Sequence, residues 1–73
     1  MEEVLKTVNR IKLARIMAEL SQTDLAKAVG VSPGSVSQWE QGKTMPNVKR
    51  LRKLSEVLNV TVDDLLEDQK EGA

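Results

Sequence analysis

The sequence contains no cysteine and no histidine among its 73 residues. Without cysteine the chain has no disulfide and no thiol chemistry, and without either residue it lacks the usual ligands of a zinc finger. We therefore expect no metal site and no cofactor. A domain of this length lies near the lower limit for folding without a disulfide or a structural metal, so its stability must come from packing alone.

Aromatic residues are almost missing too: Trp39 is the only one, although apolar residues make up 40% of the chain. This composition suits one small helical core of leucine, valine, isoleucine and alanine. No apolar run approaches the roughly 20 residues of a membrane-spanning helix, and the N-terminus lacks the basic and then apolar layout of a signal peptide. We therefore expect a cytoplasmic protein with no membrane contact.

A net charge is also lacking, because eleven basic and eleven acidic residues cancel. The charges are nevertheless segregated along the chain. Residues 4–53 hold ten lysines and arginines against three acids, a net of +7, whereas residues 54–73 hold one lysine against six acids, a net of −5. Such a distribution can turn its positive end toward phosphates, although a charged residue often does no more than solvate a helix face.

The spacing of apolar residues predicts five helices in a single domain over residues 1–73, with residues 68–73 as a frayed tail. The first helix is expected over residues 3–19. Its apolar stripe and the residues beside it are Val4, Leu5, Val8, Ile11, Arg15, Ile16 and Leu20. The stripe of the fourth helix consists of Val48, Leu51, Leu54, Val57 and Leu58. In the fifth helix, Leu65 and Leu66 are expected to close the core.

Capping residues mark the ends of these helices. Gly30 and Gly42 are expected to end the second and third helices, since glycine adopts a left-handed backbone without strain. Pro33 stands at a first helical position, where its missing N–H costs nothing. The expected N-caps of the second to fifth helices are Ser21, Ser32, Asn47 and Thr61.

Residues 22–41 have the pattern of a helix-turn-helix, two short helices that meet at Gly30. The expected buried positions are Leu25, Ala26, Val29, Val31, Val36 and Trp39. The spacing of Trp39 from Val36 favours a core position over base stacking. This packing would hold the second of these helices steeply against the first, with its other face free to enter a DNA major groove.

The run SQTDLAKAVGVSPGSVSQWEQGKTMPN, followed by LSEVLNVTVDDLL, resembles the DNA-binding domains of lambdoid phage repressors, Cro proteins and their Xre-like bacterial relatives. The resemblance covers residues 8–67 and rests on LSQxxLA, GVS, SQWEQGKxxP and VxxDxLL together. It implies a compact, all-α, lambda-repressor-like domain of five helices, with the helix-turn-helix at helices 2 and 3. It also implies a transcriptional regulator, most often a repressor, that binds an inverted-repeat operator in double-stranded DNA as a homodimer.

The resemblance assigns roles to individual residues. The expected base contacts, on the third helix, are Pro33, Gly34, Ser37 and Gln38. The expected phosphate contacts are Gln22, Ser32, Ser35, Lys43 and Thr44. Gln38 is the strongest base reader, since its amide can pair with adenine. Gly34 has no side chain to reach a base, which would leave direct readout sparse and shift discrimination onto DNA shape.

Four further expectations complete these assignments. Arg10 is a candidate phosphate contact, with a merely solvated face as the alternative. Arg15 and Glu40 are expected to form a structural ion pair across the core, as in the family pattern. The expected dimer interface consists of Met45, Pro46, Asn59, Val60 and Thr61. The cluster KRLRK covers residues 49–53. Because the spacing of Leu51 puts it on the buried side of the helix, the four cations are expected to spread around that helix. Phosphate contact from Lys49 or Arg50 is one alternative.

Alternative functions differ in how well this sequence fits them. The same sequence pattern would be found in a transcriptional activator, a restriction-modification controller or an antitoxin. A protein-interaction module is disfavoured, because such a surface usually carries exposed apolar anchors. An enzyme is disfavoured more strongly, since histidine, cysteine and a carboxylate pair in a pocket are all missing. No small-molecule ligand is expected, and the resemblance implies the cytoplasm of a bacterial or phage-infected cell.

Overall fold

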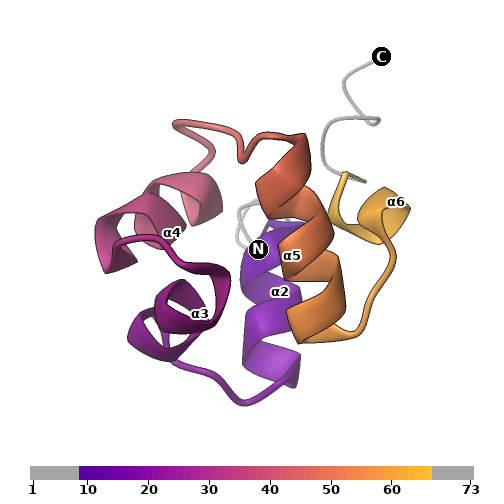
Figure 1. Ribbon diagram of the computed structural model, residues 1–73, viewed down its shortest axis with the longest axis horizontal. Coiled ribbons are helices and arrows are strands. Elements are labelled where there is room, and N and C mark those ends of the chain that lie inside the picture. The colour runs from indigo at the N-terminus through magenta and orange to yellow at the C-terminus, as the bar shows by residue number, and fades with distance from the viewer. Residues whose placement is uncertain (1–8, 67–73) are drawn as a thin grey trace, which may run out of the picture.

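The computed structural model describes residues 9–66, which form helices joined by short connections (Figure 1). The helices are α2 (Arg10–Met17), α3 (Gln22–Val29), α4 (Pro33–Glu40), α5 (Val48–Leu58) and α6 (Val62–Leu65). The predicted all-α architecture is confirmed, and the helix-turn-helix is formed by α3 and α4. None of these helices within residues 9–66 has the length and apolar character needed to cross a membrane.

The predicted N-caps begin the helices as expected. In each case a side-chain oxygen accepts a hydrogen bond from the backbone N–H three residues later, which satisfies a group that the helix leaves unpaired. The four caps are Ser21, Ser32, Asn47 and Thr61. Because each cap acts within its own turn, the starts of α3 to α6 follow directly from local sequence.

The start of α2 differs from the prediction of one continuous helix over residues 3–19. Asn9 has an extended backbone (φ −80°, ψ 168°), and its Oδ1 accepts a hydrogen bond from the N–H of Lys12 at 2.9 Å. An asparagine that caps in this way cannot continue a helix through its own position, so the predicted helix is interrupted at Asn9. Val4, Leu5 and Val8 lie outside the described residues. The helix also ends before Glu19, whose φ is 60°.

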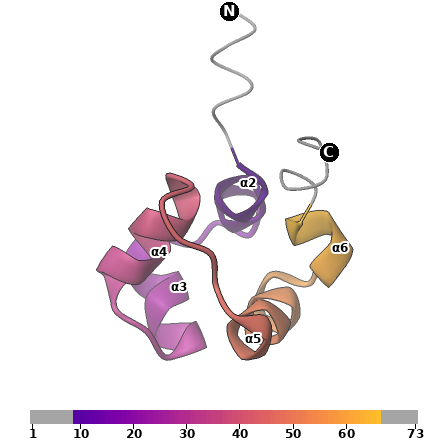
Figure 2. The ribbon, with the colours of Figure 1, turned by 90° about the horizontal axis from the view of Figure 1, so that it is seen from above.

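The core lies where α5 meets the helix-turn-helix. α3 packs against both α4 and α5, and α2 packs against α4 and α6, so the helices surround a common centre (Figure 2). Leu25, Val36 and Leu54 are fully buried. The remaining buried apolar residues are Ile11, Ala26, Val29, Trp39, Leu51, Leu58 and Leu65. Trp39 is therefore a core residue, as predicted from its spacing.

Two residues of the predicted apolar stripes are exposed instead. Ile16, near the end of α2, is 50% exposed, and Val48, the first residue of α5, is 65% exposed. Ile16 is turned about 140° from the buried Ile11 around α2, and Val48 is the first residue of α5, before the buried Leu51. Leu66 and Val57 are partly buried against the core.

We expect Gly30→Ala to lower the free energy of unfolding by about 1–2 kcal/mol. Gly30 has a φ of +87°, and nothing lies within 4 Å of an added Cβ, so the cost is backbone strain and not a clash. Gly34→Ala is the matched control: its Cβ would meet only Ser32 Oγ, at 3.8 Å, and we expect a gain of about 0.5 kcal/mol. Urea denaturation followed by circular dichroism measures both. Equal effects of the two substitutions would contradict this account.

Candidate nucleic-acid interface

The connection between α3 and α4 sets the direction of α4. Gly30 ends α3 in the left-handed conformation, and the N–H groups of Gly30 and Val31 both donate to the Ala26 carbonyl, at 2.8 and 2.9 Å. Val31 is partly buried against the core. One face of α4 is buried through Val36 and Trp39. The opposite face is left for contact with another molecule.

That opposite face carries the four predicted base-contacting residues. Pro33, Gly34 and Gln38 are exposed, and Ser37 is half-buried. The Ser37 Oγ accepts a hydrogen bond from Gln41 Nε2 at 2.7 Å, so the hydroxyl hydrogen of Ser37 is free to donate. In the described part of the chain, no hydrogen bond engages the Gln38 amide. This amide therefore has both its donor and its acceptor available, as bidentate pairing with a base edge requires.

The first turn of α4 brings two predicted phosphate contacts together. The Ser32 Oγ accepts a hydrogen bond from the Ser35 N–H at 3.2 Å, and the two hydroxyl oxygens are 3.2 Å apart. Both residues line a hollow that also includes Asn47 and Arg50 from the start of α5. The positive end of the α4 dipole and two hydroxyl groups thus lie at the same edge, an arrangement suited to a phosphate oxygen.

Gln22, the first residue of α3, is tied to α4. Its Nε2 donates to Glu40 Oε1 at 3.0 Å. An amide nitrogen has two hydrogens, so this bond leaves the second one for a phosphate. Gln22 also lines a polar hollow with Ser37, which places a predicted phosphate contact beside a predicted base contact.

The predicted ion pair between Arg15 and Glu40 is present and bidentate. Arg15 Nε lies 2.6 Å from Glu40 Oε2, and Arg15 Nη2 lies 3.2 Å from Glu40 Oε1. The side chains are 13% and 3% exposed. Arg15 Nη1 also donates to the Leu20 carbonyl at 2.8 Å. With the bond from Gln22, this network joins α2, the connection before α3, α3 itself and α4.

Asn9 supports α4 in a way that sequence reasoning missed. Its Nδ2 donates to the Trp39 carbonyl at 2.6 Å, while its Oδ1 caps α2. One side chain therefore starts α2 and satisfies a carbonyl in the last turn of α4. Asparagine is a favoured cap, which was the available signal, but the partner lies 30 residues away in the chain.

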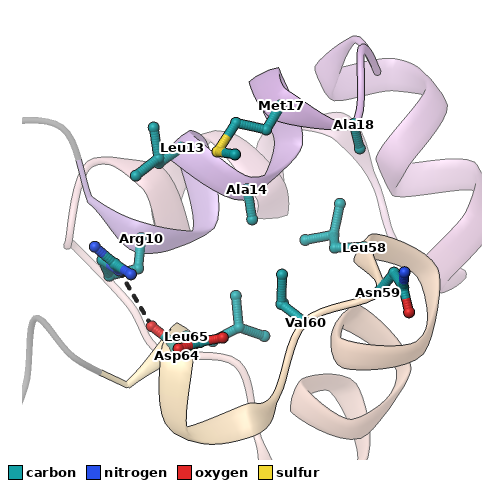
Figure 3. A pocket seen from close by; sticks show the side chains of 10 residues that line it. All are labelled: Arg10, Leu13, Ala14, Met17, Ala18, Leu58, Asn59, Val60, Asp64 and Leu65. Carbon is teal, nitrogen blue, oxygen red and sulfur yellow. Dashed lines mark hydrogen bonds between the residues drawn. The ribbon is translucent and has the colours of Figure 1, made fainter.

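The remaining predicted phosphate contacts are divided between two places. Lys43 and Thr44 are exposed in the connection from α4 to α5, directly after the helix-turn-helix. Arg10 lies elsewhere: its Nε donates to the Asp64 carbonyl at 3.3 Å, which ties α2 to α6 (Figure 3). The structure therefore does not bring Arg10 together with the other predicted phosphate contacts.

The predicted dimer residues lie at opposite ends of α5. Met45, 52% exposed, precedes this helix of eleven residues, which is about 16 Å long by its rise. Pro46 is buried within the protomer, which removes it from the predicted interface. Asn59 and Val60 follow α5 and line an apolar hollow of about 380 Å³ between α2 and α6, together with the exposed Met17 (Figure 3). Thr61 is exposed beside them.

We expect Arg15→Met to lower the free energy of unfolding by about 3 kcal/mol, because Glu40 would stay buried with only Gln22 as its partner. The double variant Arg15→Met/Glu40→Leu should regain at least about 1 kcal/mol, since it removes the unpaired charge. The exposed Lys12→Met, on the same helix, is the control and should change stability by less than about 0.5 kcal/mol. Urea denaturation compares the variants. A double variant less stable than the single one would contradict this account.

Comparison with known proteins places this geometry in a family. A family model described as helix-turn-helix matches residues 11–65. The chain is 42% identical over 57 residues to the repressor protein C2 of Salmonella phage P22, covering 78% of this chain and 26% of that protein. It is 34% identical over 61 residues to the HTH-type transcriptional activator BcrR of Enterococcus faecalis, covering 84% of this chain and 30% of BcrR.

A solved structure agrees with these sequence matches. The P22 c2 repressor protein, crystallised in complex with a synthetic operator, superposes with a TM-score of 0.76 at 41% identity, covering 81% of this chain and 89% of that one. The chain spans about a quarter to a third of the length of the two relatives named above. The resemblance to phage repressors is confirmed, and this chain belongs to the helix-turn-helix family.

Proposed function

We propose that this chain binds a specific sequence in double-stranded DNA, with α4 in the major groove, and regulates transcription from that site. The single observation that carries the proposal is the exposed face of α4, on which the Gln38 amide is unpaired within the described residues. Its action is binding and not catalysis. The corresponding location is the cytoplasm of a bacterial or phage-infected cell.

The surroundings of α4 support a division between base and backbone contacts. Gln38 and Ser37 offer donors and acceptors to base edges, while Gln22, Ser32 and Ser35 offer hydrogen bonds to phosphates on either side of the helix. Lys43 and Thr44 extend the backbone contacts past the end of α4. Phosphate contacts fix the register of a helix in the groove, and base contacts then read the sequence.

Repression is the regulatory outcome that needs the least from this chain. A protein that occupies an operator excludes polymerase or another regulator by its presence alone, whereas activation requires an additional surface for the transcription machinery. One relative is named a repressor and another an activator. We therefore propose a repressor, with activation as the alternative within the same family.

A selection experiment tests Gln38 as the base reader. Duplexes enriched from a random pool by the wild-type protein should contain an inverted repeat, and Gln38→Ala should relax one symmetric pair of positions while the rest of the sequence is retained. The decrease in discrimination should correspond to about 1–3 kcal/mol for each half-site. Gln41→Ala, an exposed glutamine one turn later, is the matched control and should leave that pair unchanged. No enrichment by the wild type would reject the proposed function.

We further propose that two copies bind the operator as a homodimer. A single α4 with two polar base readers contacts few bases, so useful specificity needs two half-sites, which lie about 34 Å apart on one face of DNA. We assign the contact between copies to the end of α5 at Asn59–Thr61, because the partly buried Val60 lines an apolar hollow there together with the exposed Met17.

This assignment predicts different effects at the two ends of α5. Val60→Asp should reduce the affinity for the inverted repeat about tenfold or more while leaving the affinity for a single half-site within about twofold. Met45→Asp, at the opposite end, should change neither. Fluorescence anisotropy with both duplexes measures this, and circular dichroism checks that both variants are folded. Loss of cooperative binding in Met45→Asp alone would move the interface to the other end of α5.

A further inference from the structure

Four cationic side chains gather on the first half of α5. Lys49, Arg52 and Lys53 are exposed, and Arg50 is half-buried. All four line one hollow between α5 and the end of α3. The four cations are spread over the exposed side of α5, and all of them border this one hollow. Lys49 stands three and four residues before Arg52 and Lys53, a spacing that puts these three side chains on the same helix face, while the intervening Leu51 is buried in the core.

These four cations have no anionic partner within residues 9–66. None of their side chains takes part in an ion pair or hydrogen bond in that range. Glu56, at the far end of the hollow, is the one acidic residue in its lining. Lys49 and Arg50 also occupy the first turn of α5, where the positive end of the helix dipole disfavours cations. An anion bound there would relieve both the mutual repulsion and the unfavourable dipole interaction.

Arg50 connects these cations to the interface on α4. It lines the hollow shared with Ser32 and Ser35 at the start of α4, and it also lines the hollow of the other three cations. The chain passes from α4 to α5 through the short connection that holds Lys43 and Thr44 (Figure 1). A single long anion that crosses the start of α4 would therefore continue over α5. This continuity favours the DNA backbone over an acidic protein segment.

We propose that Lys49, Arg50, Arg52 and Lys53 form a phosphate-binding strip that contacts the DNA backbone beside the base pairs contacted by α4. This inference rests on the proposed function and adds a second set of contacts to it. The four residues span about 6 Å of helix axis, and DNA carries one phosphate per 3.4 Å on each strand, so the strip reaches about two neighbouring phosphates or more. Its contribution is independent of sequence and weakens with salt.

The test is the salt dependence of binding to a 40-base-pair duplex recovered by the selection. The slope of log K against log salt should be less steep by about 0.9 for each phosphate that the variant no longer neutralises. We expect a change of about 2–4 in the variant Lys49→Gln/Arg50→Gln/Arg52→Gln/Lys53→Gln, with unchanged base preference. Lys53→Gln and Lys27→Gln form a matched pair of exposed lysines. We expect the first to change the slope by about 1 and the second to leave it nearly unchanged.

Duplexes with single methylphosphonate linkages, which lack the phosphate charge, locate the contact. A neutral linkage at a phosphate that only the strip contacts should weaken wild-type binding and have no effect on the four-residue variant, whereas a neutral linkage at a phosphate contacted by Gln22, Ser32 or Ser35 should weaken both proteins. Equal slopes for wild type and variant would overturn the strip. Binding of poly-L-glutamate to the wild type alone, with equal DNA slopes, would assign the strip to an acidic protein and overturn the proposal. If selection enriches no duplex, the proposed function fails, and slopes on a mixed-sequence duplex still test the strip.

Discussion

The bidentate ion pair between Arg15 and Glu40 is the interaction on which the rest of the interface depends. It lies between α2 and α4, with the Glu40 side chain only 3% exposed, and both partners have further bonds, to the Leu20 carbonyl and from the Gln22 amide. A charge removed from water costs several kcal/mol unless its lone pairs are satisfied in one geometry. The network therefore favours one position of α4 relative to α2 and α3.

A fixed position of α4 has consequences for the interface at both of its ends. Glu40 stands in the last turn of α4 and holds Gln22 at the start of α3, so one predicted phosphate contact is positioned by the same carboxylate that fixes the helix. At the other end, Ser32 caps the first turn and keeps its hydroxyl beside Ser35. Gln22, Ser32 and Ser35 are thus held by bonds within the protein before any DNA is present. Such preorganisation lowers the entropy lost on binding.

The sequence was sufficient for features that depend on neighbours within one or two turns. The caps Ser21, Ser32, Asn47 and Thr61 act locally, and the core phase of Trp39 follows from helical spacing. It was not sufficient where distant residues decide. The bond from Asn9 to the Trp39 carbonyl and the bond from Arg10 to the Asp64 carbonyl each join residues far apart in the chain. An apolar stripe does not reveal how far the core extends, so Val48 was misplaced. The sequence placed the α5 cations on the exposed side of the helix, but the hollow that all four border with the end of α3 depends on how α5 packs against α3.

The sparse base-reading face of α4 and the cations of α5 are explained by the same energetic requirement. Gly34 has no side chain and Pro33 has no polar group, so the proposed function leaves direct readout to Gln38 and Ser37, and each such contact would discriminate by only about 1–3 kcal/mol. Affinity must then come from the backbone, whose contacts are numerous but independent of sequence. A domain with zero net charge can supply these contacts only by concentrating its cations where phosphates pass. Under the proposed function, the separation of charge along this chain, with an acidic last segment and a basic α5, would have that effect without an overall charge that attracts all nucleic acid alike.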